Sequence, residues 1–292
     1  MRGNPEAHQL IAPSSLSAAL GYLAESPGQW MPIAGGTELM VAHAAGRLSS
    51  PKLINLWGLK ELSGISATDE TLTIGAGVTF RELRADPIVA SDFPLLALAA
   101  SWVGSIANQS RATLAGNIVN GSPAADAPPA LLVYDAEIEL ISLTGRRRMM
   151  YPAFHTGYKR TRMNPDELVL ALHLPRRFGR HHTYLRKVGT RKAMAITKVA
   201  LAATALLDGE IISEIRLAAA SLADRPVRLV ATEAALLGHP LSAATIDRAL
   251  RVMLEEAKPI DDIRSTEAYR RHVGANLLGE FLAQLVHTEG AR

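Results

Sequence analysis

The 292-residue chain contains no cysteine. Without a thiol it can form no disulfide, zinc–thiolate site or iron–sulfur cluster of its own, and it offers no cysteine nucleophile. Aromatic residues make up only 5% of the chain, which argues against a surface that stacks nucleic-acid bases. The 31 basic and 28 acidic residues nearly balance, so the net charge also gives little support for nucleic-acid binding.

Long apolar runs are also absent. The best candidate, Phe93 to Val103, contains a proline and a serine and is shorter than the ~18–20 residues needed to cross a bilayer. The segment Met1 to Pro13 is polar and lacks the apolar centre of a signal peptide. With 48% hydrophobic and 20% charged residues, the composition is that of a folded globular protein. We therefore expect no membrane span and a cytoplasmic location.

The first part of the chain, about residues 1–58, alternates between helical and extended patterns. Ser15 can cap a helix over residues 16–23, and a second helix is predicted over residues 37–45. Residues 29–34 and 51–56 have the character of strands. This alternation is typical of an α/β unit.

A second part, residues 59–175, mixes strands and helices. Strands are predicted over residues 71–74, 136–142 and 167–174, and helices over residues 80–85 and 94–103. Asp126 is placed to cap a helix whose first turn contains Pro128 and Pro129. Together, residues 1–175 are predicted to form one domain of two subdomains.

The remainder, residues 176–292, is predicted to be a smaller domain. Asp208-Gly209 lies between two apolar runs, a strong signal for a β-hairpin despite the many alanines. Helices are predicted over residues 226–237, 241–257 and 266–287. The stretch Arg176 to Lys192 holds seven Lys or Arg and no acid. It is interpreted as a solvated face, as a docking strip, or as a contribution to neutralising the charge of a cofactor.

The first candidate binding loop joins a predicted strand to a predicted helix. Its residues are Pro32, Ile33, Ala34, Gly35, Gly36, Thr37, Glu38 and Leu39. The two glycines let a ligand approach the backbone closely, and the N–H groups of the following turn can bind a phosphate. The alternative is an ordinary strand-to-helix turn. The loop is neither a P-loop nor the three-glycine dinucleotide fingerprint.

The second candidate loop, residues 111–130, is rich in small and hydrogen-bonding residues. It includes Thr113, Ala115, Gly116, Asn117, Asn120, Ser122 and Asp126. Long loops in compact domains are often functional, although this one could also be an irregular loop tied to itself by Asn and Ser. Two loops about 75 residues apart suit a long dinucleotide better than a single phosphate.

Four stretches, in this order, resemble a known family. They are Ala34 to Leu39; Thr113 to Asn117 with Ser122 to Asp126; Phe154 to Lys159 leading to Pro165 to Val169; and Tyr184 to Arg191. They look like the FAD-binding medium subunits of molybdenum hydroxylases, of the xanthine dehydrogenase and carbon monoxide dehydrogenase type. The resemblance covers nearly the whole chain. It departs from the family pattern at Ala115, where a glycine is usual.

The resemblance implies an α+β fold: a two-part FAD-binding domain of the vanillyl-alcohol-oxidase (PCMH) type, then a smaller α+β domain with an antiparallel sheet and helices. It implies non-covalently bound FAD in this chain, a small subunit with [2Fe–2S] clusters and a large subunit with molybdopterin, as a heterotrimer or a dimer of heterotrimers. Electrons would pass from the clusters through FAD to NAD⁺, O₂ or another acceptor. The missing cysteines agree with metal chemistry on other chains.

The resemblance also assigns roles to residues of this chain. The first loop would wrap the FAD diphosphate, and Thr113, Gly116 and Asn117 would contact the diphosphate or ribityl region. Asp126 would bind a flavin-side hydroxyl or the adenosine ribose. Further cofactor contacts are implied for Ile74, Gly75, Val169 and Lys187, with Lys187 near the flavin ring. No catalytic or metal-ligating side chain is predicted.

Two other functions remain open from the sequence. One is a stand-alone FAD oxidase of the vanillyl-alcohol-oxidase type, although such enzymes usually carry a larger substrate-capping domain. The other is a non-catalytic nucleotide-binding module that has kept the fold.

Overall fold

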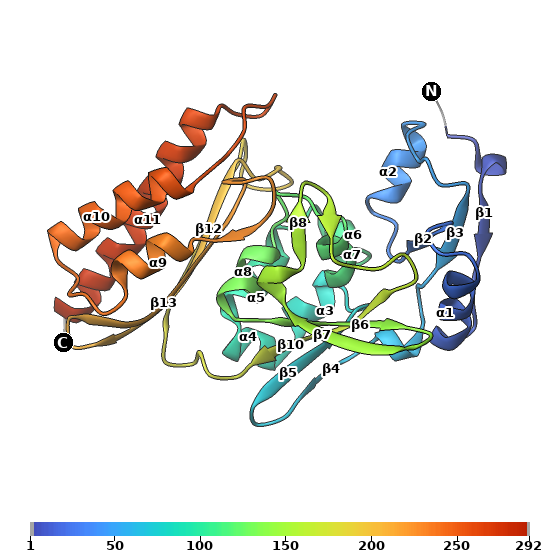
Figure 1. Cartoon of the computed structure of the whole chain (residues 1–292), viewed down its shortest axis with the longest axis horizontal. Coiled ribbons are helices and arrows are strands. Elements are labelled where there is room, and N and C mark those ends of the chain that lie inside the picture. The colour runs from blue at the N-terminus through green and yellow to red at the C-terminus, as the bar shows by residue number, and fades with distance from the viewer. Residues whose placement is uncertain (1–2, 291–292) are drawn as a thin grey trace.

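The computed structural model describes residues 3–290, so residues 1, 2, 291 and 292, at the ends of the two predicted domains, lie outside it. Three main sheets follow one another across the molecule, with helices between and beside them (Figure 1). The mixed α+β class predicted from the sequence is confirmed. Within the described residues, none of the helices is both long and apolar enough to span a bilayer.

The first sheet is parallel, in the order β1-β3-β2. Its elements are the 3₁₀ turn η1 (Pro5–Ala7), β1 (Gln9–Ile11), α1 (Leu16–Glu25), β2 (Trp30–Ile33), α2 (Leu39–Ala44) and β3 (Lys52–Asn55). As predicted, the Ser15 hydroxyl caps α1 by accepting from the N–H of Ala18 at 3.2 Å. The turn from β2 to α2 is the first glycine loop.

The second sheet is antiparallel, in the order β4-β5-β10-β6-β7. Its strands are β4 (Ile65–Ala67), β5 (Thr71–Gly75), β10 (Leu168–Pro175), β6 (Glu137–Ser142) and β7 (Gly145–Met150). Between β5 and β6 the chain forms α3 (Phe80–Ala85), α4 (Pro87–Asp92), α5 (Pro94–Trp102), α6 (Ile106–Gln109), α7 (Leu114–Val119) and α8 (Pro128–Val133). A small hairpin, β8 (His155–Gly157) with β9 (Arg160–Thr161), precedes β10.

The third sheet, β11-β12-β13-β14, is also antiparallel. Its elements are β11 (His182–Val188), β12 (Val199–Asp208), β13 (Ile211–Ala220) and β14 (Val227–Arg228), followed by α9 (Val230–Leu236), α10 (Ala243–Glu256) and α11 (Glu267–Gly290). The predicted hairpin is confirmed, with Gly209 at a φ of +57°. The predicted start of a helix at Pro226 is wrong, because Val227 and Arg228 pair with β13 and α9 begins only at Val230.

The alanines of this sheet have a packing reason. Helices α5 and α8 contact one face of it, and α9 and α11 contact the other (Figure 1). Ala202 pairs with Leu185 on one side and Ala218 on the other, and all three belong to the core shared with the first part of the chain. A small side chain lets a helix approach the strand closely, so an alanine-rich strand can be buried on both faces.

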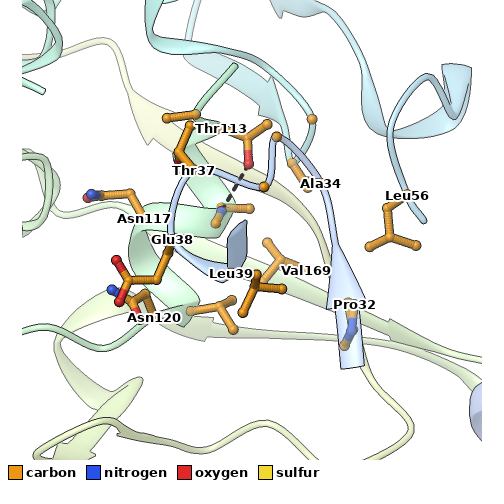
Figure 2. A pocket seen from close by; sticks show the side chains of 18 of the residues that line it. Pro32, Ala34, Thr37, Glu38, Leu39, Leu56, Thr113, Asn117, Asn120 and Val169 are labelled. Atoms are coloured by element: carbon orange, nitrogen blue, oxygen red, sulfur yellow. Dashed lines mark hydrogen bonds between the residues drawn. The ribbon is translucent and has the colours of Figure 1, made fainter. Parts of the chain in front are cut away.

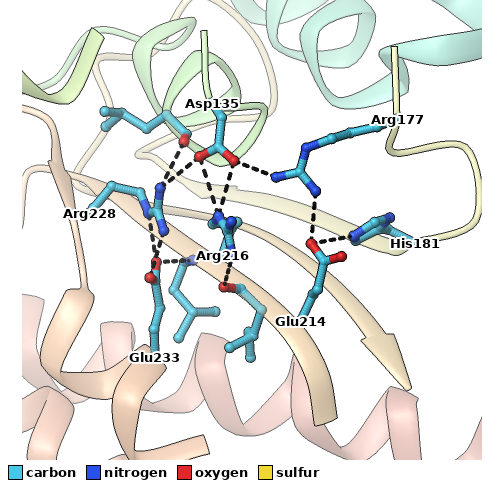
Figure 3. A network of polar contacts seen from close by, with 10 residues as sticks. Asp135, Arg177, His181, Glu214, Arg216, Arg228 and Glu233 are labelled. Atoms are coloured by element: carbon cyan, nitrogen blue, oxygen red, sulfur yellow. Dashed lines mark hydrogen bonds and ion pairs between the residues drawn. The ribbon is translucent and has the colours of Figure 1, made fainter. Parts of the chain in front are cut away.

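A polar network joins the second and third parts of the molecule (Figure 3). The Asp135 carboxylate, just after α8, accepts from Arg177 at 2.7 Å, Arg216 at 3.2 Å and Arg228 at 3.1 Å. Arg177 also pairs with Glu214 at 2.8 Å. Within the basic stretch, Arg177 belongs to this network and Arg176 pairs with Asp92 at 2.7 Å, so these two cations bind within the chain, while Arg180 is exposed as a solvated face predicts.

Candidate functional site

A cavity of about 550 Å³ opens where the first glycine loop, helix α7 and the start of β10 meet (Figure 2). In that view Asn117 and Asn120 project from α7 beside Glu38, while Leu39 lies next to Val169. This volume is typical of sites that bind small molecules or cofactors.

Most of the predicted binding residues line this one cavity. They are Pro32, Ala34, Gly35, Gly36, Thr37, Glu38, Leu39, Thr113, Ala115, Gly116, Asn117, Asn120 and Val169. The two glycine loops, far apart in the sequence, therefore converge on a single space. This convergence is the arrangement that a long ligand held at two points requires.

The two glycines of the first loop serve different purposes. A Cβ on Gly35 would overlap the carbonyl group of Arg111, so this glycine lets the two loops touch each other rather than a ligand. Gly36 has a φ of +73°, a conformation that side chains with a Cβ rarely adopt. An isolated antiparallel β-bridge between Thr79 and Thr113 also holds the second loop in place.

The first loop presents unused hydrogen-bond donors. Within the described part of the chain, the backbone N–H groups of residues 35–39 donate to no acceptor, and the first bond of the turn runs from the N–H of Met40 to the carbonyl of Gly36 at 2.9 Å. A run of free N–H groups at the start of a helix is suited to an anion such as a phosphate.

The second loop adds a buried polar atom that lacks a partner. Thr113 caps α7 by accepting from the N–H of Gly116 at 3.1 Å. One turn further on, the side-chain oxygen of Asn117 is buried in the cavity wall and accepts no hydrogen bond from the described residues. Buried polar atoms are seldom left unpaired, so this oxygen favours a ligand that donates to it. Ala115 lies inside α7 and is absent from the positive-φ residues, which explains why alanine is tolerated where the family pattern has glycine.

Six predicted residues do not line the cavity: Ile33, Ile74, Gly75, Ser122, Asp126 and Lys187. Ile74 is fully buried in the core, and a Cβ on Gly75 would press on the carbonyl of Leu62. The Ser122 hydroxyl accepts from the N–H of Ala124 at 3.2 Å and closes a turn. Their predicted contacts with a cofactor therefore stay predictions.

Asp126 and Lys187 pair with each other. The Lys187 ammonium lies 2.9 Å from the Asp126 carboxylate, which also accepts from the Thr197 hydroxyl at 2.6 Å. Burial raises the pKa of Asp126, although Lys187 and Thr197 oppose the shift. The prediction that Asp126 caps α8 is wrong, since the cap position is Ala127 and no side chain bonds there.

Several lining residues were missed by the sequence analysis: Met31, Leu56, Leu62, Ala76, Gly77, Val103, Asn108, Ala112, Val119, Lys159, Met163 and Leu168. Most are apolar, and nothing in their local pattern distinguishes a cavity wall from a core. Lys159 did carry a signal, because it ends the stretch Phe154 to Lys159 that resembles the family. Asn108 stands in a short polar run before the second loop.

Comparison with known proteins agrees with this geometry. Residues 6–177 match the family model of the FAD binding domain in molybdopterin dehydrogenase, and residues 184–285 match that of the CO dehydrogenase flavoprotein C-terminal domain. The xanthine dehydrogenase FAD-binding subunit of Escherichia coli is 30% identical over 96% of both chains. The carbon monoxide dehydrogenase medium chain of Hydrogenophaga pseudoflava is 25% identical over 94% of this chain and 95% of its own.

Solved structures share the fold over nearly the full length. Carbon monoxide dehydrogenase from Hydrogenophaga pseudoflava, in a form that lacks the Mo-pyranopterin moiety of its molybdenum cofactor, superposes with a TM-score of 0.89 at 26% identity, covering 93% of this chain and 94% of that one. Quinoline 2-oxidoreductase from Pseudomonas putida 86 shares the fold with a TM-score of 0.89 at 23% identity, covering 99% of both chains. The chain therefore belongs to the family of FAD-binding subunits of molybdenum-containing dehydrogenases and hydroxylases.

Proposed function

We propose that the cavity between the two glycine loops is where this chain binds FAD without a covalent bond. The run of free N–H groups in residues 35–39, beside the unpartnered oxygen of Asn117, carries the proposal. The N–H groups would hold the diphosphate, Asn117 would accept from a donor of the cofactor, and Leu39 and Val169 would contact its apolar parts. Bound FAD supplies a redox group that exchanges electrons singly or in pairs.

We propose that the chain passes electrons between partner subunits and a final acceptor. It would receive them from [2Fe–2S] clusters of a small subunit, supplied in turn by molybdopterin in a large subunit, and deliver them to NAD⁺, O₂ or another acceptor. The absence of cysteine supports this division, because the clusters need thiolates from other chains. The relatives named as medium chains or FAD subunits also support membership of a heterotrimer, or a dimer of heterotrimers. We place the chain in the cytoplasm.

We further propose that another subunit selects the substrate. Relatives of similar identity are named for glyceraldehyde, carbon monoxide and nicotinate dehydrogenases. These substrates share little chemistry, yet the chain that resembles ours accompanies each of them. We therefore propose that substrate specificity resides in another subunit.

We also propose that residues 1–175 and 176–292 are the two folding units. Two separate clusters of buried apolar side chains support this division: one is formed mainly by residues up to Phe178, the other by residues from Tyr184 to Leu285. Limited proteolysis should separate the two units at the exposed Gly179 and Arg180, between the buried Phe178 and β11. Early cutting inside β10 or β12 would contradict the boundary.

The test is purification of the full chain from its native source, followed by flavin, iron and molybdenum analysis. We expect one FAD per chain, released intact by acid because it is not covalently attached, and two further subunits that contain the iron and molybdenum. Reduction of the isolated chain's flavin by a small alcohol would instead identify a stand-alone oxidase. ADP binding without any flavin would identify a nucleotide-binding module.

A further inference from the structure

Few charged side chains lie on the cavity wall. Among the described residues that line it, only Glu38 and Lys159 carry a charge. Two cations on or next to the predicted binding segments do not line it: Lys187 pairs with Asp126 at 2.9 Å, and the Arg111 guanidinium stacks on Trp57, 3.8 Å from the ring centre. Lys159 is therefore the one cationic residue among the described residues that line this cavity.

The backbone of Lys159 is held in place by the second glycine loop. It lies in the turn of the β8–β9 hairpin with a φ of +52°. Its N–H donates to the carbonyl of Gly121 at 3.2 Å. A Cβ on Gly121 would stand 2.9 Å from the Lys159 Cα, so the two segments are in direct backbone contact just beyond α7.

The base of the hairpin is anchored in the core. Phe154 and Tyr151 are fully buried, and the Tyr151 hydroxyl lies 2.9 Å from Nε2 of His155. The Lys159 side chain itself is exposed, and no carboxylate of the described residues pairs with it. The hairpin thus holds the backbone of Lys159 at the cavity wall, and its unpaired side chain is available to an anion bound there.

We propose that Lys159 neutralises the FAD diphosphate and so makes this cavity favour FAD over flavins that lack the diphosphate. This inference rests on the proposed function and names the cation that acts with the backbone N–H groups of the first loop. A lysine ammonium is a compact charge that binds phosphate oxygens without requiring a fixed fork geometry.

The test uses the flavin-free full-length chain and three variants: Lys159→Gln, Lys159→Arg and Arg160→Gln. Arg160 is the matched control, because it is an exposed cation in the same hairpin that does not line the cavity. Flavin fluorescence titrations give the Kd for FAD and for riboflavin at low and high salt. At low salt we expect Lys159→Gln to weaken FAD binding about five- to tenfold, with Lys159→Arg and Arg160→Gln close to the unchanged chain.

Two further results are expected if the contact is ionic. High salt should reduce the difference in the Kd for FAD between the unchanged chain and Lys159→Gln, because screening weakens an exposed charge contact. Lys159→Gln should not weaken riboflavin binding, since riboflavin carries no diphosphate. Thermal unfolding of each flavin-free variant checks that the hairpin is intact.

Other outcomes overturn the inference. They are an unchanged FAD Kd in Lys159→Gln, an equal loss in Lys159→Arg or Arg160→Gln, or a loss that persists at high salt and extends to riboflavin. The last result would assign Lys159 a packing role. If the unchanged chain binds no FAD at all, the proposed function itself fails, which is a separate and recognisable result.

Discussion

Asp126 and Lys187 form an ion pair of 2.9 Å across the junction between the second glycine loop and β11. Their side chains are only 13% and 11% exposed. The Thr197 hydroxyl completes the site at 2.6 Å from the same carboxylate. Because water is largely excluded, each charge depends on the other for compensation.

Replacement of Lys187 by Met should destabilise the protein by about 3–5 kcal/mol, because it leaves a buried carboxylate without its cation. The double variant Lys187→Met with Asp126→Asn should recover much of this loss. Urea unfolding of the single and double variants measures both free energies. A double variant no more stable than Lys187→Met would show that the pair is not the source of the loss.

The loss of folding free energy caused by Lys187→Met should itself depend on pH. Burial raises the folded-state pKa of Asp126 above the unfolded value of 3.8, so its contribution is most favourable at low pH and is lost as pH rises through the folded value. Without Lys187 the folded-state pKa of Asp126 rises further. The loss of stability in Lys187→Met should therefore be larger near neutral pH than in mild acid. A deficit that grows on acidification would contradict this reasoning.

Gly36→Val should abolish FAD binding and leave the fold largely intact. The φ of +73° at Gly36 is strained for valine, and the added Cβ would approach Cγ of Met40 to 3.2 Å. The loop at the cavity wall would therefore leave this conformation and displace the free N–H groups of residues 35–39, while the buried core is not touched. The contrasting variant is Gly35→Ala, which should destabilise the whole chain because its methyl group overlaps the Arg111 carbonyl. Flavin content and thermal unfolding of both variants separate the two effects, and stoichiometric FAD in Gly36→Val would refute the assignment of the first loop.

Asn117→Leu should weaken FAD binding by about tenfold without destabilising the flavin-free chain. Removal of a buried oxygen that has no partner is neutral or slightly stabilising, whereas loss of a ligand's hydrogen bond lowers affinity. Unfolding of the flavin-free protein and an FAD titration are the two measurements. A matched control is Asn276→Leu, which should leave FAD binding unchanged because Asn276 is exposed on α11 and does not line the cavity. A large loss of stability in Asn117→Leu would show that the amide has a structural role.

Acid should destabilise the protein through His155. Burial, assisted by the nearby Arg225, lowers the pKa of His155 from 6.5 to about 4. Between pH 4 and 6.5 the unfolded state therefore binds a proton at His155 more readily than the folded state does. The free energy of unfolding is at its full value above pH 6.5 and falls by up to roughly 3 kcal/mol as the pH decreases toward 4. Urea unfolding of His155→Phe across this range should show a flatter pH dependence.

The exposed His287 is the control for that experiment. His287→Gln should keep the pH dependence of the unchanged chain. If the free energy of unfolding of His155→Phe falls as steeply between pH 6.5 and 4 as that of the unchanged chain, another group is responsible for the acid sensitivity.

Features that depend on neighbours in sequence were predicted well. Ser15 caps α1, and Asp208-Gly209 turns β12 into β13, because capping and turn preferences act over a few residues. The helix expected from Pro226 began late because Arg228 bonds Asp135 and Glu233 from an extended backbone. Asp135 lies 93 positions from Arg228 in the sequence, so a local sequence pattern could not predict this contact.

The sequence alone determined the two glycine loops and the family they indicate, since both are properties of short stretches of backbone. Only the tertiary structure showed that Gly35 makes room for Arg111, and that Asp126 faces Lys187 instead of capping α8. It likewise placed Lys159 at the cavity wall, through contact with Gly121. These relationships join residues 38 to 76 positions apart, and their free energy comes from packing and the exclusion of water, which no local pattern encodes.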